Sequence, residues 1–307
     1  MEQRTELRRR RKRRSPVKAF FKVGLLLVVL LIAYGIFTFW QGLQLADNEA
    51  AREPFNGTPY ESGRMNVLLL GVDSRGEEQS RTDTMMIASW DPDTNDVRLI
   101  SLMRDIYATI PGYQSYKLNT AYYLGGAELT KQTVEEMFDV PIHHYALIDF
   151  TSFETMVDVI APDGIEVDVE KDMSEKIGVS LTKGVHRLNG KELLGYARFR
   201  ADEEGDFGRV GRQQLVIEAL GNELTNPMNF HRLPKFAGAL NGYVQTDVGA
   251  SEKVRYLIDA ILGGKVETER LTIPQEGAYW YNSYNHAGSV IELDQEAART
   301  AIHDFLQ

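Results

Sequence analysis

The chain has 307 residues, of which 43% are hydrophobic; it contains no cysteine, and its net charge at pH 7 is −10. This apolar content excludes a disordered chain, and the lack of cysteine excludes a secreted fold built on disulfides. Residues 1–22 hold ten of the 34 Lys and Arg residues but only two of the 44 Asp and Glu residues. An apolar run follows this basic tip at once, which indicates a membrane topology and argues against a nucleic-acid-binding arm.

Residues 23–40, VGLLLVVLLIAYGIFTFW, carry no charge. Together with residues 19–21 they can span about 30 Å of hydrocarbon as a helix. The run is longer than the core of a signal peptide and no small-residue cleavage site follows it, so we predict an uncleaved anchor. Positive charge stays on the cytoplasmic side. The sequence therefore predicts a single-pass type II protein of the cell membrane, with a cytoplasmic tip at 1–18, a transmembrane helix at 19–40, a linker at 41–62 and an extracellular catalytic domain at 63–307.

After the linker, strand and helix patterns alternate. Short apolar runs predict strands at 65–73, 84–90, 97–103, 145–150, 164–170 and 269–274, and the turn-like DPDTND between the second and third predicts a hairpin. Amphipathic patterns predict helices at 126–138, 151–160, 189–199, 208–224, 231–240, 251–262 and 294–306. Thr151 with Glu154 three residues later resembles a capping box. The order predicts an α/β fold: a single α-β-α sandwich with a mixed central sheet, preceded by one transmembrane helix.

Charged side chains gather where the predicted strands end. Asp73 closes the first strand, and Arg81 and Asp83 come just before the second. Ligands of open α/β sheets collect at such ends. Two carboxylates there can share Mg²⁺, or Mn²⁺ in its place, with phosphate oxygens and water completing the shell. Considered alone, both aspartates read more simply as turn or capping residues.

Two further pairs lie in similar positions. Arg104 and Asp105 follow the third strand, and Lys117 and Asn119 follow a Pro-Gly turn. Considered alone, the first pair is a surface ion pair that contributes little, and Lys117 is a solvated side chain. Because every cluster falls at a strand end or in the loop beyond it, we expect them to share one rim of the sheet.

The stretch RFRADEEGDFGRVGRQQ, residues 198–214, concentrates arginine in an acidic chain. Arg198 and Arg200 share a side if the backbone is extended, and Asp206 precedes a helix whose first N–H groups favour an anion. Spacing of i, i+3 and i+4 places three more side chains on one helix face: Arg209, Arg212 and Gln213. Arginine forks suit phosphate oxygens. The pattern predicts a site for a polyanion with several phosphate oxygens and a divalent metal.

The sequence lacks the motifs that mark several enzyme classes. The sequence contains no G-x-x-x-x-G-K-[ST] loop and no G-x-S-x-G elbow, and its one His pair, His143–His144, lacks metal-site spacing. Nucleoside triphosphates are scarce outside the membrane. A tethered domain with a polyanion site therefore points to a lipid-borne phosphate.

Five stretches of the sequence together resemble a known protein family. Behind a basic tip and one apolar helix, the chain contains in this order NVLLLGVDSR, RTDTMMI, LISLMRDIY, KLNTAYYLGG and RFRADEEGDFGRVGRQQ. This series resembles the LytR-CpsA-Psr family, and within it the teichoic-acid ligases of Gram-positive bacteria. The resemblance implies transfer of an anionic glycopolymer from undecaprenyl pyrophosphate to the C6 hydroxyl of N-acetylmuramic acid in peptidoglycan, with a long apolar pocket for the isoprenoid. Met103 stands where the family often has proline, which removes no charged group.

The resemblance also implies residue roles. Asp73 and Asp83 correspond to the Mg²⁺-associated acids. Arg81, Arg104, Arg198, Arg200, Arg209 and Gln213 correspond to the residues around the pyrophosphate, and Lys117, Asn119 and Asp206 fall on motif positions. Helix spacing, and not the resemblance, adds Arg212 in support. Among all of these, we expect direct catalytic roles for Asp73, Arg104, Asp105, Arg198 and Asp206.

Charge suggests the mechanism. A sugar hydroxyl attacks the glycan-side phosphorus and expels undecaprenyl phosphate, and Mg²⁺ with the arginines stabilises the developing charge. Asp105 or Asp206 is the candidate base. Two alternatives stay open: a pyrophosphatase that uses water as acceptor, and a non-catalytic membrane-anchored regulator that binds polyprenyl phosphates.

Overall fold

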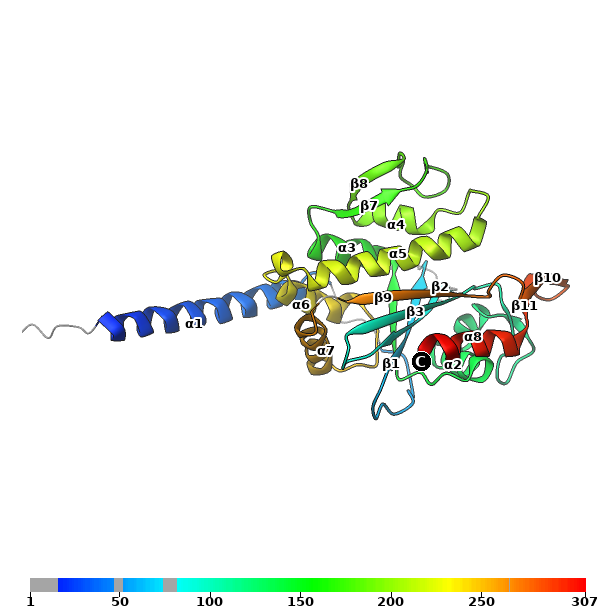
Figure 1. Ribbon diagram of the computed structural model, residues 1–307, viewed down its shortest axis with the longest axis horizontal. Coiled ribbons are helices and arrows are strands. Elements are labelled where there is room, and N and C mark those ends of the chain that lie inside the picture. Colours follow the sequence, from blue (N-terminus) through cyan, green and yellow to red (C-terminus); the bar gives the residue numbers. More distant parts are fainter. Residues whose placement is uncertain (1–15, 47–51, 74–81, 265) are drawn as a thin grey trace, which may run out of the picture.

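The computed structural model describes residues 16–46, 52–73, 82–264 and 266–307 (Figure 1). Its first element is the long helix α1 (Pro16–Leu43), which projects from the rest of the molecule. Within the described residues, the segment Phe20–Leu43 is the one helix long and apolar enough to cross a membrane. The observed helix extends three residues beyond each end of the predicted span. The basic tip up to residue 15 lies outside the described part, and the division into tip, linker and domain stays a prediction.

A five-stranded mixed sheet forms the centre. Its order is β6-β1-β2-β3-β9, with β1–β2 and β2–β3 antiparallel and β1–β6 and β3–β9 parallel. The strands are β1 (Met65–Val72), β2 (Thr82–Trp90), β3 (Asp96–Leu102), β6 (His144–Asp149) and β9 (Glu267–Ile273). The predicted hairpin is β2–β3, and the continuous apolar run of β1 is buried along most of its length. The mixed sheet of the sequence prediction is confirmed.

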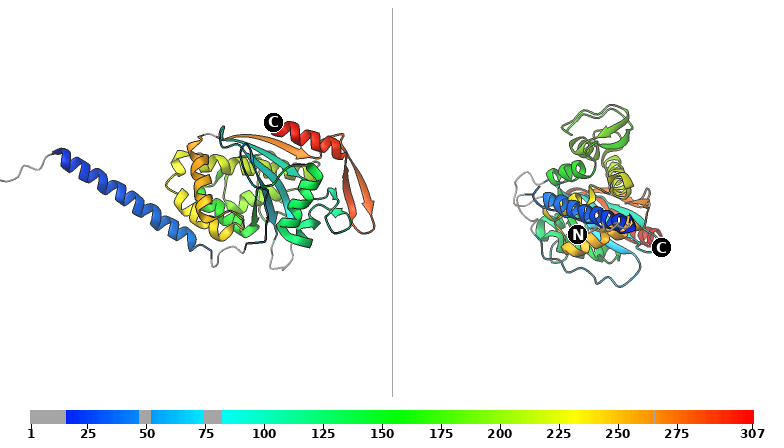
Figure 2. Two further views of the ribbon diagram at one scale, coloured as in Figure 1. Left: turned by 90° about the horizontal axis from the view of Figure 1, so that it is seen from below. Right: turned by 90° about the vertical axis from the view of Figure 1, so that its left-hand side faces the viewer.

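Helices cover both faces of this sheet (Figure 2). One face packs on α2 (Thr120–Phe138) and α8 (Gln295–Leu306). The other lies under α3 (Phe150–Ile160), α4 (Gly190–Arg198) and α5 (Gly205–Thr225). After α5, the 3₁₀ turn η1 (Pro227–Asn229) leads into two more helices, α6 (Leu233–Tyr243) and α7 (Ala250–Leu262). All seven predicted helices are present, and the α-β-α sandwich is confirmed.

Three small antiparallel pairs lie outside the central sheet. They are β4–β5 (Tyr107–Ala108 and Tyr116–Lys117), β7–β8 (Ile165–Val169 and Gly184–Leu188) and β10–β11 (Tyr279–Tyr284 and Gly288–Leu293). The predicted strand at 164–170 is therefore real, but it pairs with β8 over the helical layer. Its alternating burial explains this, because only one face of β7 meets the core.

The predicted capping box at Thr151 is wrong. Helix α3 begins one residue earlier, and Asp149 is its N-cap, whose carboxylate accepts from the backbone N–H of Ser152 at 2.9 Å. An aspartate at the end of β6 reaches the first free N–H groups before Thr151 can. A capping box is present instead at α4, between Asn189 and Glu192.

Candidate functional site

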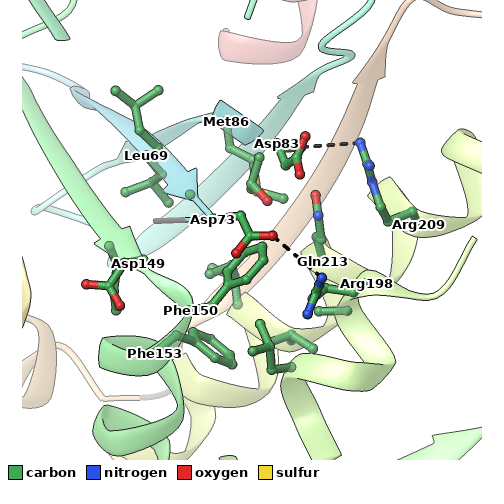
Figure 3. Close-up of a pocket in the computed structure, with 18 of the residues that line it drawn as sticks. Leu69, Asp73, Asp83, Met86, Asp149, Phe150, Phe153, Arg198, Arg209 and Gln213 are labelled. Atoms are coloured by element: carbon green, nitrogen blue, oxygen red, sulfur yellow. Dashed lines mark hydrogen bonds and ion pairs between the residues drawn. The ribbon is translucent and has the colours of Figure 1, made fainter. Parts of the chain in front are cut away.

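A cavity of about 1010 Å³ lies between the central sheet and the helices α3 to α6 (Figure 3). One end is polar and is lined by Asp73, Asp83, Arg104, Arg198, Arg200, Arg209 and Gln213. The other part is mostly apolar and is lined by Leu69, Met86, Ala146, Ile148, Phe153, Leu194, Val216, Ile217, Leu224, Leu240 and Val244. Thr84, Asp149, Glu175 and Lys176 also line the cavity. The seven polar residues come from strand ends and from the arginine stretch, so the predicted shared rim is present. The cavity suits a ligand with a charged head and a long apolar tail.

Arg104 is the centre of the polar end. Its guanidinium bonds to the carboxylate of Asp83 and lies 3.8 Å from that of Asp206 and 3.9 Å from that of Asp105. Burial lowers the pKa of Arg104, but the carboxylates of Asp83 and Asp206 outweigh it and raise that pKa above its ordinary value. Arg104 is thus a fixed positive charge.

Arg209 is buried beside it, on the first turns of α5. Its Nη2 donates to the carboxylate of Asp206 at 3.0 Å and to the backbone carbonyl of Asp83 at 3.2 Å. Burial, and after it the charge of Arg104, lowers the pKa of Arg209, although Asp206 opposes the shift. The Nε atoms of Arg104 and Arg209 have no hydrogen-bond partner among the described residues. A buried donor left in this state costs about 1–3 kcal/mol.

Arg198 and Arg200 complete the set from the end of α4. The Arg198 guanidinium lies 3.8 Å from the Asp73 carboxylate and over the ring of Phe150, 4.5 Å from its centroid (Figure 3). Arg200 is exposed and lines the cavity, and Gln213 lines it from α5. The predicted prongs, Arg198 with Arg200 and Arg209 with Gln213, therefore meet at one polar end.

The remaining predicted residues surround this end. Lys117 bonds the Asp105 carboxylate at 2.7 Å, and the backbone N–H of Asn119 donates to the Arg104 carbonyl at 3.2 Å. These residues hold the Arg104 loop, and the cavity wall does not include them. Arg81 lies outside the described residues.

Arg212 occupies a different place from the one expected. Its side chain is 2% exposed and bonds Glu170 at 2.6 Å, Asp202 at 2.9 Å and the Phe199 carbonyl at 3.1 Å. It does not line the cavity. Arg209, Arg212 and Gln213 do share helix α5, but Glu170, just after β7, and Asp202, in the loop before α5, hold Arg212 away from the ligand end.

Arg212→Ala is expected to lower the free energy of unfolding by about 3 kcal/mol, because it leaves the buried Asp202 carboxylate with only the partly exposed Lys171 as a counter-charge. Urea denaturation followed by circular dichroism measures this. Arg200→Ala, at an exposed position, should change it by less than about 0.5 kcal/mol. A stable Arg212→Ala protein that loses only ligand affinity would contradict this structural role.

The polar end also fits a divalent cation. Asp73 and Asp83 line it together. No group of three or more His, Asp or Glu side chains that could hold a metal is present in the part of the chain that the structure describes. Mg²⁺ needs only one or two protein carboxylates when phosphate oxygens and water fill the other positions. The two aspartates therefore fit a metal that arrives with a phosphate ligand.

Sequence reasoning missed the aromatic edge of the site. The hairpin β10–β11 borders the rim, where the N–H of Ile291 donates to the Asp105 carbonyl at 2.9 Å. Tyr279 of this hairpin packs on Phe207, with ring centroids 5.6 Å apart. The run YWYNSY was the only available signal, and nothing in it indicated which part of the domain it would meet. Phe150 was missed in the same way.

Comparison with known proteins agrees with this geometry. The LytR_cpsA_psr family model matches residues 40–302. The regulatory protein MsrR of Staphylococcus aureus is 43% identical over 279 residues, which cover 90% of this chain and 85% of that protein. The polyisoprenyl-teichoic acid–peptidoglycan teichoic acid transferase TagU of Oceanobacillus iheyensis is 32% identical over 304 residues, covering 92% and 93%.

Solved structures share the fold. The crystal structure of TagV from B. subtilis has a TM-score of 0.66 and 26% identity, covering 80% of this chain and 98% of that one. A structure of TagT with bound octaprenyl pyrophosphate lipid has a TM-score of 0.59 and 24% identity, covering 81% and 92%. The family model spans the central sheet, the arginine stretch and all but the last turn of the final helix. The chain belongs to the LytR-CpsA-Psr family.

Proposed function

We propose that this protein transfers an anionic glycopolymer of the teichoic-acid type from undecaprenyl pyrophosphate to the C6 hydroxyl of N-acetylmuramic acid in peptidoglycan, forming a phosphodiester. One observation carries the proposal: a single cavity joins an apolar part to an end with four arginines. The isoprenoid fills the apolar part, and the pyrophosphate lies at Arg104, Arg198, Arg200 and Arg209. The relative TagU is named a transferase of this kind, and TagT holds a lipid of this class.

The arginines supply most of the positive charge that would bind the pyrophosphate. Arginine forks bind phosphate oxygens in pairs of hydrogen bonds. The guanidiniums of Arg104 and Arg209 are held in place by the carboxylates of Asp83 and Asp206. Such donors are fixed before the substrate arrives, so they stabilise developing charge without reorganisation.

The reaction breaks the phosphoanhydride bond of the pyrophosphate and forms a phosphodiester. The acceptor hydroxyl attacks the glycan-side phosphorus, the new P–O bond forms, and the bond to the bridging oxygen breaks to release undecaprenyl phosphate. Asp105 and Asp206 both lie within 4 Å of the Arg104 guanidinium, and the hydroxyl proton passes to one of the two. Asp73 and Asp83 would hold Mg²⁺, or Mn²⁺ in its place, which supplies positive charge to the phosphate oxygens.

The orientation of the domain relative to the membrane follows from the α1 anchor and the basic tip. We place the chain in the cell membrane with α1 spanning it, the basic tip in the cytoplasm and the cavity outside, because positive charge stays on the cytoplasmic side. The cavity then faces the compartment that holds peptidoglycan. A protease added to intact cells should cut the domain and spare the tip.

The direct test uses the full-length protein in detergent with Mg²⁺, a synthetic lipid-pyrophosphate glycan and peptidoglycan oligomers. Mass spectrometry should find glycan joined to peptidoglycan through phosphate. Free phosphorylated glycan as the only product would show a pyrophosphatase. No turnover with either acceptor would overturn the enzymatic proposal.

Chelation of divalent cations is expected to lower the transfer rate by about 100-fold or more, since a bound metal contributes several kcal/mol to charge stabilisation. Lipid binding should persist, because the arginines and the apolar wall do not need the metal. Rates in EDTA, then with Mg²⁺ or Mn²⁺ restored, measure the effect, and fluorescence titration follows binding. Full activity in EDTA would rule out the metal role of Asp73 and Asp83.

A second function has one observation in its favour: the relative MsrR is named a regulatory protein. A regulator that only binds polyprenyl phosphates would use the same cavity. Asp73→Ala separates the two, because loss of transfer in this variant supports the enzyme. An effect on regulation in a protein that never shows turnover supports the regulator.

A further inference from the structure

The outer end of α1 packs lengthwise against α6. Three contacts follow in the same order along both segments: Gly35 with Pro234, Phe39 with Gly238, and Leu45 with Tyr243. Because the residue numbers rise together, the two helices run parallel. The first turn of α6 therefore lies beside Gly35, well inside the apolar span.

Two glycines make this contact close. A Cβ on Gly42 would lie 2.0 Å from the Lys235 carbonyl oxygen, and a Cβ on Gly238 would lie 2.2 Å from the Phe39 carbonyl oxygen. No other residue fits at either position without moving the helices apart. Small residues allow such backbone contact between helices in a membrane. The approach fixes how α6 is placed along α1.

The depth of α6 follows from helix geometry. The apolar span ends at Leu43, and Gly35 lies about 12 Å further down the helix at 1.5 Å per residue. Trp40 is exposed and of the type that lies at the membrane–water boundary, which puts Gly35 about 7 Å inside it. The start of α6 beside Gly35, and the turn η1 just before it, lie at or below this level.

The chain between α5 and α6 is suited to that place. Met228 is 78% exposed and Phe230 is 40% exposed, although both are apolar. In Figure 1 this connection is the part of the domain that reaches furthest along α1. His231 follows directly and is exposed, whereas the Arg232 guanidinium is held within the domain by Asn229 and Asp163. Exposed apolar side chains beside a membrane-spanning helix are typical of segments that lie in a membrane interface.

The cavity ends at the same place. Leu224, in the last turn of α5, and Leu240 of α6 line its apolar part. These helices are the two that the η1 connection joins. The apolar end of the cavity is therefore next to the segment at membrane depth, and the arginines lie at its other end.

We propose that the connection at residues 225–233 is inserted in the outer leaflet beside α1, so that an isoprenoid chain passes from the bilayer into the cavity without crossing water. The partner is the lipid surface itself. The inference rests on the proposed membrane anchoring by α1 and does not depend on the transfer reaction.

Depth measurement tests this directly. The chain has no cysteine, so Met228→Cys and Tyr281→Cys each give a single labelling position. Tyr281 is 67% exposed on β10, at the opposite end of the domain. Full-length protein with a nitroxide label is placed in vesicles of phosphatidylcholine and phosphatidylglycerol. Relaxation by oxygen and by an aqueous nickel chelate should place the label at residue 228 about 5–10 Å inside the interface, and the label at residue 281 in water. A label at residue 228 as accessible to nickel as that at residue 281 would overturn the proposal.

Lipid uptake gives an independent test. Met228→Asp combined with Phe230→Asp should slow uptake of a fluorescent polyprenyl pyrophosphate from vesicles by about tenfold or more, since charge opposes insertion. Uptake from detergent micelles should not change, which also shows that the variant folds. Val185→Asp, at an exposed apolar position on β8, is the matched control and should take up lipid normally from both. Equal uptake from vesicles by all variants, or an equal loss from micelles, would contradict the proposal. A correct depth with no transfer would instead refute only the proposed function.

Discussion

Arg198→Ala is expected to lower the rate of transfer by about three orders of magnitude, because an arginine that stabilises the charge of a phosphoryl transition state contributes about 10³-fold or more. Arg198 lies at the polar end of the cavity, 3.8 Å from Asp73 and over the ring of Phe150. It is partly exposed and is not part of the packed core, so the free energy of unfolding should change little. Single-turnover rates with a lipid-pyrophosphate glycan measure the loss, and urea denaturation checks the fold.

Two variants make this result specific. Arg198→Lys keeps the charge but loses the planar fork, so it should recover only part of the rate. Arg255→Ala removes an arginine of α7 that is exposed and outside the cavity, and it should transfer at the normal rate. If Arg198→Ala transfers normally, the pyrophosphate lies elsewhere and the proposed substrate position is wrong.

Ala146→Phe is expected to weaken binding of a long-chain polyprenyl pyrophosphate by about 100-fold or more, which corresponds to about 2.7 kcal/mol. Alternate residues of a strand face opposite sides of a sheet. On β6, Tyr145 and Leu147 are buried in the core, whereas Ala146 and Ile148 line the cavity. A phenyl ring at position 146 would therefore occupy the space of the isoprenoid and leave the core intact.

Substrate length supplies the control for this variant. A water-soluble analogue with a very short chain should bind Ala146→Phe almost as well as the original protein, since the arginine end is unchanged. Ala146→Val should show an intermediate loss for the long chain. Fluorescence titration with both lipids measures these affinities. Equal loss for the short and long chains would mean that the ring disturbs the polar end, and no loss for either would show that the tail does not use this cavity.

The central strands were predictable because their signal is local. β1 is a continuous apolar run, and β2 and β3 are similar runs joined by a tight turn, so the chain itself specifies a buried hairpin. β7 shows that a local pattern predicts a strand but not its pairing partner. Its apolar alternation is as clear as that of a sheet strand, but the pattern does not state which partner it pairs with, and the structure pairs it with β8.

The polar end of the site was predictable for a related reason. Strand ends and the loops beyond them lie on the rim of a sheet, so Asp73, Asp83 and Arg104 could be expected to meet. The apolar wall was not predictable in detail. Its residues come from β1, β2, β6, α3, α4, α5 and α6, and each of them also fits an ordinary core position.

Arg209 and Arg212 show most clearly which features follow from the sequence and which depend on the tertiary structure. By itself the sequence determined that a basic tip and an apolar span precede an α/β domain, and that the arginines of α5 share one helix face. Only the tertiary structure decided that Arg209 meets Asp83 and the cavity, whereas Arg212 is buried with Glu170 and Asp202. The physical reason is that helix periodicity follows from local geometry, while the partner of a charged side chain depends on distant segments that pack against it.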